Sequence, residues 1–122
     1  MNPKILLVED NEQNRYLATF LLENSGFTVL HASDGHKAVA LAASERPALV
    51  LMDIQMPEMD GYEAARRILS TPGLAAMPIV AVTSYAMAGD REKALGLGFA
   101  GYIEKPISTE TFIAEINRYL PL

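Results

Sequence analysis

The feature that most constrains this fold is an apolar run that ends in one carboxylate. Residues 48–52 read Ala-Leu-Val-Leu-Met, Asp53 follows them, and the loop beyond contains Pro57. An unbroken apolar run closed by a turn signal is typical of a strand buried on both faces of a parallel sheet. In open α/β sheets, ligands bind beyond the carboxyl ends of the strands. We therefore expect Asp53 to be the reactive residue of a site at that edge.

Strand and helix patterns alternate along the whole chain. Strand-like runs cover 4–8, 27–32, 79–82 and 100–103, and Thr28 and His31 give the second run the polarity of an edge strand. Helical spacing of apolar residues lies between these runs, with start and stop signals at expected places. We expect one helix that starts after Asn11 and is stopped by Gly26, and a second that starts after Asp34 and is ended by Pro47. Two more should cover 60–69 and 89–97, and the last should start after Ser108 and run to the end of the chain. This alternation predicts a parallel sheet with helices on both faces.

Two local details of these helices can be predicted from the residue types. In the first helix, Leu17, Phe20 and Leu21 recur at helical spacing, with Leu22 as a further candidate, so we expect these residues on its buried side. Ser108 precedes the final helical pattern and is a residue type that caps helices, so we expect it to be the N-cap.

Composition excludes several classes of function. The chain has 122 residues, a domain-sized length, and ten Lys and Arg against fifteen Asp and Glu give a net charge of −5. This balance argues against a nucleic-acid partner and against docking on anionic membrane. The absence of cysteine excludes thiolate chemistry and thiolate metal sites. No segment is typical of a membrane span or signal peptide, so we expect a cytoplasmic protein of one domain, 1–122, without an output domain.

Polar residues follow four of the predicted strands. Glu9 and Asp10 follow the first strand, Asp53 ends the central run, Thr83 follows the run 79–82, and Lys105 follows the last strand. The carboxyl ends of parallel strands meet at one edge, so these side chains should share a pocket. Three carboxylates and one ammonium call for a divalent cation, and oxygen ligands suit Mg²⁺. A metal, a lysine and a hydroxyl around one carboxylate are what phosphoryl transfer to Asp53 requires.

At this point the sequence resembles the response-regulator receiver domain of two-component signalling, over its whole length. Among the subtypes, it is most similar to single-domain regulators and to receivers of hybrid histidine kinases. The resemblance implies a flavodoxin-like (βα)5 three-layer sandwich with a five-stranded parallel sheet in the order 2-1-3-4-5. It rests on the motifs Val-Glu-Asp-Asn at 8–11, Leu-Met-Asp-Ile-Gln-Met-Pro at 51–57, Asp-Gly at 60–61, Val-Thr-Ser at 82–84 and Lys-Pro at 105–106.

The resemblance also implies how the acidic residues act. Asp53 is expected to accept a phosphoryl group from a phosphohistidine of a histidine kinase or phosphotransfer protein. Asp10, Asp53 and the backbone carbonyl of Gln55 are expected to ligate Mg²⁺, for which Mn²⁺ can substitute. Glu9 is expected to act mostly through a bound water.

The same resemblance assigns a switch to the other strand ends. Lys105 is expected to contact the phosphoryl group, and its bond to Pro106 to be cis. Thr83 is expected to move toward the phosphate, and Tyr102 to turn inward behind it. The surface of the fourth helix, fifth strand and fifth helix would then bind a downstream protein, with the domain a monomer or a weak phosphorylation-dependent dimer.

Two other functions remain as alternatives. One is a haloacid-dehalogenase-like phosphohydrolase with an aspartyl-phosphate intermediate. Such enzymes carry a second aspartate two residues after the nucleophile, where this chain has Gln55, which cannot act as a general acid. The other is a receiver-like scaffold that works without phosphorylation, against which the intact acidic pocket argues. We therefore expect a phosphoacceptor that assists its own phosphorylation and dephosphorylation, and not an enzyme.

Overall fold

The computed structural model describes residues 3–54, 59–83 and 90–120, in which strands and helices alternate. The strands are β1 (Lys4–Val8), β2 (Thr28–Ala32), β3 (Leu49–Asp53), β4 (Ile79–Thr83) and β5 (Gly101–Glu104). The helices are α1 (Glu12–Asn24), α2 (Gly35–Glu45), α3 (Gly61–Leu69), α4 (Asp90–Gly96) and α5 (Phe112–Tyr119). The predicted alternation is confirmed, and each strand ends within one residue of its predicted position.

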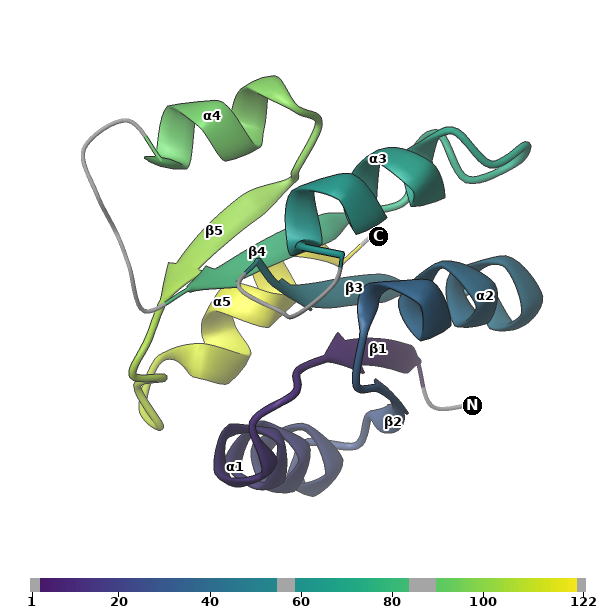
Figure 1. Cartoon of the computed structure of the whole chain (residues 1–122). Helices are drawn as coiled ribbons and strands as arrows, with labels where there is room; N and C mark the ends of the chain where they lie inside the picture. The colour runs from purple at the N-terminus through teal and green to yellow at the C-terminus, as the bar shows by residue number, and fades with distance from the viewer. Residues whose placement is uncertain (1–2, 55–58, 84–89, 121–122) are drawn as a thin grey trace.

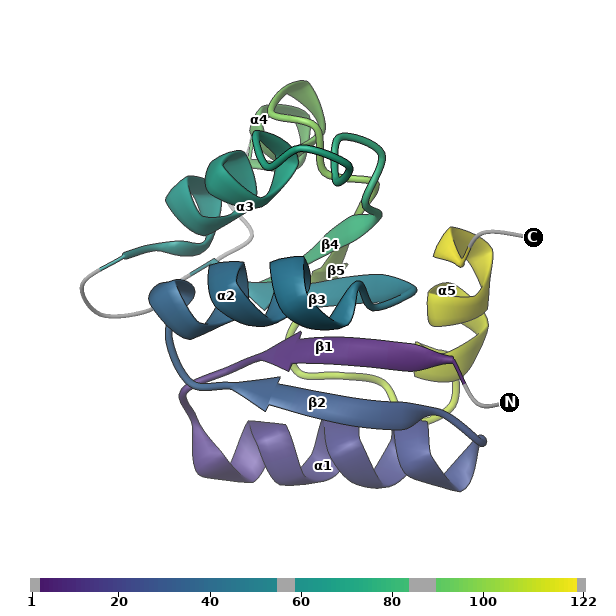
Figure 2. The same cartoon turned by 90° about the vertical axis from the view of Figure 1, so that its right-hand side faces the viewer.

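All the strands form one parallel sheet in the order β2-β1-β3-β4-β5. Helices α2, α3 and α4 cover one face of this sheet, and α1 and α5 cover the other (Figures 1 and 2). The flavodoxin-like fold and the strand order implied by the resemblance are confirmed. The exposed Thr28 and His31 lie on β2, which is an edge strand as their polarity indicated.

Side chains of the central strands alternate between two hydrophobic cores. In β3, Leu49 and Leu51 join the core under α1 and α5, whereas Val50 and Met52 join the core under α2, α3 and α4. Because both faces are covered, every residue of β3 and β4 is buried. This double burial explains why these strands read as continuous apolar runs.

The predicted position of Phe20 is wrong, because its side chain is 55% exposed. Helix α1 buries the candidate Leu22 together with Ala18, one turn before it, while Leu17 and Leu21 are half-buried. The apolar positions of this helix extend around about half of its circumference, and the sheet covers only the stripe through residues 18 and 22.

Three helices, α1, α2 and α3, begin at the N-cap residue that the sequence indicates. The side chains of Asn11, Asp34 and Asp60 accept the backbone N–H three residues further on, as N-caps do. The prediction for Ser108 is wrong, because α5 begins at Phe112. The backbone carbonyl of Ser108 accepts the N–H of Phe112, and Ser108 therefore opens a turn that precedes the regular helix.

In the described part of the chain, no helix has the length and apolar character that crossing a membrane requires.

Candidate functional site

Strand register brings the predicted residues to one edge of the sheet. Val8 of β1 pairs with Met52 of β3, so Glu9 and Asp53 both occupy the next position along their strands. Asp53 pairs with Val82 of β4, which places Thr83 one residue beyond. The convergence expected from the parallel topology is thus present among the described residues.

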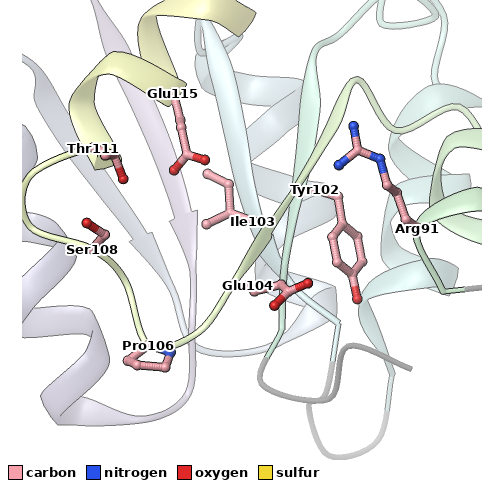
Figure 3. A pocket seen from close by; sticks show the side chains of 8 residues that line it. All are labelled: Arg91, Tyr102, Ile103, Glu104, Pro106, Ser108, Thr111 and Glu115. Atoms are coloured by element: carbon pink, nitrogen blue, oxygen red, sulfur yellow. The ribbon is translucent and has the colours of Figure 1, made fainter. Parts of the chain in front are cut away.

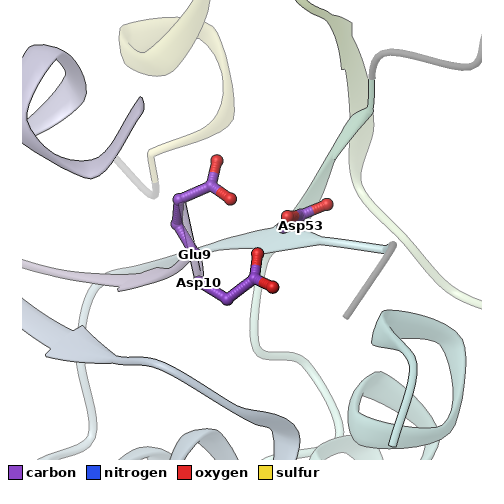
Figure 4. A group of neighbouring side chains, drawn as sticks. All are labelled: Glu9, Asp10 and Asp53. Atoms are coloured by element: carbon purple, nitrogen blue, oxygen red, sulfur yellow. The ribbon is translucent and has the colours of Figure 1, made fainter. Parts of the chain in front are cut away.

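Three carboxylates form a compact cluster at this edge. One oxygen from each of Glu9, Asp10 and Asp53 lies within 4.8 Å of the others (Figure 4). Glu9 and Asp53 are both 4% exposed, whereas Asp10 is exposed to solvent. Two like charges about 4 Å apart repel by about 4 kcal/mol at an effective dielectric constant of about 20. Such a cluster is therefore stable only with positive charge beside it.

Lys105 supplies one positive charge to the cluster. Its Nζ lies 2.6 Å from Glu9 Oε1 and 3.5 Å from Asp53 Oδ2, with 12% of the side chain exposed. The backbone N–H of Lys105 donates to the carbonyl of Thr83 at 2.7 Å, which ties the two strand ends together. The peptide bond between Lys105 and Pro106 is cis, as expected.

The donor set fits a small divalent cation. Glu9, Asp10 and Asp53 offer hard oxygen ligands from two neighbouring strand ends. Three carboxylates and the Lys105 ammonium leave a formal charge of −2, which one divalent ion balances. Mg²⁺ is commonly held by one or two carboxylates together with waters, and the exposed Asp10 leaves room for water.

The predicted switch residues lie on the adjacent strands. Thr83 is fully buried at the end of β4, and Tyr102 in β5 is 8% exposed. Gln55 lies outside the described residues.

A surface hollow of about 290 Å³ opens beside Tyr102, on the α4, β5 and α5 side of the molecule (Figure 3). Its other lining residues are Arg91, Ile103, Glu104, Pro106, Ser108, Thr111 and Glu115. Pro106 lies in its wall and follows Lys105 directly in the chain.

Sequence reasoning missed how Glu9 is held. Its backbone N–H donates to the carbonyl of Ala32, and its carbonyl accepts from the guanidinium of Arg15. Its carboxylate also accepts the N–H of Asn11 at 3.4 Å, besides the ion pair with Lys105. No sequence signal identifies these contacts, because they depend on how far side chains reach across the sheet edge.

Comparison with known proteins agrees with this architecture. A model of the response regulator receiver domain matches residues 5–117. The polar-differentiation response regulator DivK of Brucella anthropi is 42% identical over 120 residues, which cover 98% of each chain. The protein of the same name from Brucella ovis is 41% identical over the same length.

Solved structures give the same result. The receiver domain of sensor histidine kinase PA1611 from Pseudomonas aeruginosa matches with a TM-score of 0.89 and 35% identity over 98% of both chains. That structure has a magnesium ion coordinated in its active site cleft. Chemotaxis protein CheY4 of Vibrio cholerae matches with a TM-score of 0.92 and 27% identity, over 98% of this chain and 100% of that one. The chain therefore belongs to the response regulator receiver domain family and has a phosphoacceptor role in phosphorelay signalling.

Proposed function

We propose that Asp53 is the phosphoacceptor and that the donor is a phosphohistidine of a histidine kinase or phosphotransfer protein. A carboxylate oxygen of Asp53 attacks phosphorus, so an O–P bond forms while the P–N bond breaks and the imidazole leaves with its electron pair. The observation that carries this proposal is the position of Asp53, buried at the end of β3 with acids on one side and the ammonium of Lys105 at 3.5 Å.

We propose Mg²⁺ as the cofactor, with Mn²⁺ as a substitute. Glu9, Asp10 and Asp53 would hold the ion, together with the backbone carbonyl of Gln55. When bound, the ion supplies positive charge against the negative charge of the arriving phosphoryl oxygens. The compact carboxylate cluster and the magnesium ion in the PA1611 receiver support this assignment.

In this proposal, Lys105 and Thr83 bind the phosphoryl group. The Lys105 ammonium pairs with one phosphoryl oxygen, and the Thr83 hydroxyl donates a hydrogen bond to another. Thr83 moves toward the phosphoryl group, and Tyr102 turns inward behind it. The burial of Thr83 and Tyr102 and the backbone bond between Lys105 and Thr83 support these roles.

The surface formed by α4, β5 and α5 is the proposed contact for a downstream protein. The hollow beside Tyr102 carries Arg91, Glu104 and Glu115, so a partner with both charge signs suits it (Figure 3). Phosphorylation would act by changing the population of two packings of this surface. A monomer or a weak phosphorylation-dependent dimer and a cytoplasmic location stay predictions of the sequence.

The test is intact mass after incubation with acetyl phosphate and Mg²⁺. Wild type should gain one phosphoryl group, and Asp53→Asn should gain none because an amide is no nucleophile here. Asp34→Asn is the matched control, since Asn replaces Asp well as an N-cap and Asp34 caps α2 outside the carboxylate cluster. Chelation of the metal should remove the gain in wild type.

The same experiment separates the alternatives. A phosphoryl group on Asp53→Asn would overturn the assignment of Asp53. Continuous release of phosphate from organic monoesters would support a phosphohydrolase. Wild type that stays unmodified with acetyl phosphate and with a phosphorylated histidine donor would support the scaffold.

A further inference from the structure

Helix α4 is held in place by few of its own residues. Among residues 91–96, only Ala94 is buried, and the others are exposed to solvent. A helix of seven residues is also too short to be stable without tertiary contacts. The contacts that α4 makes with neighbouring elements therefore determine where it lies.

One of these contacts comes from Tyr62, the second residue of α3. The Nζ of Lys93 lies 4.5 Å from the centroid of the Tyr62 ring, which is the distance of a cation–π contact. The same ring packs edge-on against Phe99, with the ring centroids 5.8 Å apart and the planes at 69°. Phe99 is buried and lies between α4 and β5. The Tyr62 ring therefore contacts both α4 and the segment that follows it.

The first turn of α3 also packs on the strand that carries Asp53. The N–H of Gly61, the residue before Tyr62, donates to the carbonyl of Ile54 at 3.3 Å. A Cβ at Gly61 would lie 2.6 Å from the carbonyl oxygen of Asp53, so the helix start and the end of β3 are in direct contact. This turn therefore connects the strand end at Asp53 to the ring that contacts Lys93.

Resting on the proposed function, we infer that Tyr62 and Lys93 couple the phosphorylation of Asp53 to the position of α4. The first turn of α3 must follow any movement of the end of β3, because Gly61 packs directly on its backbone. A cation–π contact requires the cation within about 6 Å of the ring centroid, so moving the ring about 1.5 Å away from Nζ breaks it. Phosphorylation thus weakens this contact and loosens α4.

Tyr62 is a positioning residue in this route, because it acts on α4 through Lys93. The contact supplies the two arrangements, made and broken, that coupling between two sites requires. The route is separate from the backbone bond between Thr83 and Lys105, since α3 joins β3 to α4 directly. Loss of the Lys93 ammonium should therefore change the response of α4 and leave the phosphorylation of Asp53 intact.

The test is amide hydrogen exchange in α4, followed by NMR with and without excess acetyl phosphate and Mg²⁺, with phosphoryl occupancy read from intact mass. The N–H groups of Leu97 and Phe99 donate to the carbonyls of Lys93 and Ala94, so these two amides report on the end of α4. Lys93→Met removes the cation, and Tyr62→Leu removes the ring. Lys93→Arg is the matched control, because arginine also makes cation–π contacts.

We expect Lys93→Met to quicken exchange about two- to fivefold in the unphosphorylated protein. In the phosphorylated protein, where the contact is already weakened, the effect should be less than about 1.5-fold. In a Tyr62→Leu background, Lys93→Met should change exchange less than about 1.5-fold in both forms, and Lys93→Arg alone should behave as wild type.

Equal quickening by Lys93→Met in both forms would show a contact that is only structural, and the inference would be overturned. It would also be overturned if Lys93→Arg exchanged as fast as Lys93→Met, or if the effect of Lys93→Met persisted without the Tyr62 ring. Failure of the proposed function is distinguishable by mass, because wild type would then gain no phosphoryl group, and the inference would fall with it.

Discussion

Replacing Gly61 with alanine tests whether the packing of α3 against β3 positions Asp53. A Cβ at Gly61 would lie 2.5 Å from the Cα of Ile54 and 2.6 Å from the carbonyl oxygen of Asp53. Both are backbone atoms, which cannot turn aside as the end of a side chain can. The N–H of Gly61 also donates to the carbonyl of Ile54 at 3.3 Å, so the two segments are in direct contact. The added methyl group must therefore push the helix start or the end of β3 away.

The size of the effect follows from two opposing contributions. Forcing a methyl group into a filled space costs about 1–3 kcal/mol. Alanine also restricts the unfolded chain more than glycine does, which offsets about 0.4–1 kcal/mol. The two contacts with backbone place the cost in the upper part of its range, so we expect a net loss of about 1–2 kcal/mol in the free energy of unfolding. For a domain of this size, that loss lowers Tm by about 4–8 °C.

The functional effect should exceed what lost stability explains. Misplacing a reacting group by about 1 Å can cost about a hundredfold in rate. We expect Gly61→Ala to slow phosphorylation by acetyl phosphate at least about tenfold, at a temperature where the variant is folded. Gly101→Ala is the matched control, because its Cβ would collide with the ring of Tyr119, and Gly101 pairs with Val80 toward the other end of the sheet.

Gly101→Ala should lose less stability than Gly61→Ala, because the Tyr119 ring can turn aside, and it should keep its phosphorylation rate within about twofold once the folded fraction is counted. The reasoning about Gly61 is refuted if Gly61→Ala is destabilised and still phosphorylated at the wild-type rate. It is equally refuted if both glycine variants slow by the same factor, because the effect would then follow stability and not the position of Asp53.

Three further predictions concern other parts of the structure. Lys93 Nζ lies 4.5 Å from the centroid of the Tyr62 ring, so Lys93→Met should lower stability by about 0.5–1 kcal/mol, and denaturant titration should find no such loss in a Tyr62→Leu background. Hydrogen bonds from Arg66 and then from Arg67 lower the pKa of Glu63 from 4.5 to about 2. The stability from this carboxylate is therefore present above about pH 4.5 and lost as the pH falls through about 2, and acid titration of Glu63→Gln should lack that dependence. Phe112 is fully buried, so Phe112→Ala should cost about 3–5 kcal/mol in thermal unfolding.

The residues at the carboxyl ends of the strands could be predicted from the sequence because short stretches of sequence mark where each strand ends. A strand buried on both faces leaves an apolar run, and its end is marked by the first charged residue, as at Asp53. Parallel topology then gathers the ends, so Glu9 and Thr83 could be placed beside Asp53 without a structure. The caps at Asn11 and Asp34 were visible for the same reason, since a cap depends on residues three apart.

The predictions failed where the position of a side chain depends on contacts with residues that are distant in the sequence. Phe20 has the same helical spacing as Leu17, but the stripe that packs on the sheet passes through Ala18 and Leu22. Helical spacing gives the apolar arc of a helix and does not say which part of the arc a partner covers. The preference of Lys105 for Glu9 was hidden likewise, because it rests on the reach of two long side chains across the sheet edge.

The site and the outer surface share a short covalent and hydrogen-bonded path. Thr83 and Lys105, which both face Asp53 in the proposed function, are joined by the 2.7 Å backbone bond, so they move together. Pro106 follows Lys105 directly and lines the hollow with Tyr102. The phosphoryl group on Asp53 carries a charge of about −1.5 to −2, but the carboxylate charge is lost when the acyl phosphate forms, so the added negative charge beside Lys105 is about one unit or less. Coupling between sites is typically about 1–3 kcal/mol, and one rearranged ion pair at this position is of that order. In the proposed function, the surface formed by α4, β5 and α5 therefore responds to phosphorylation of Asp53 without any change in the register of the sheet.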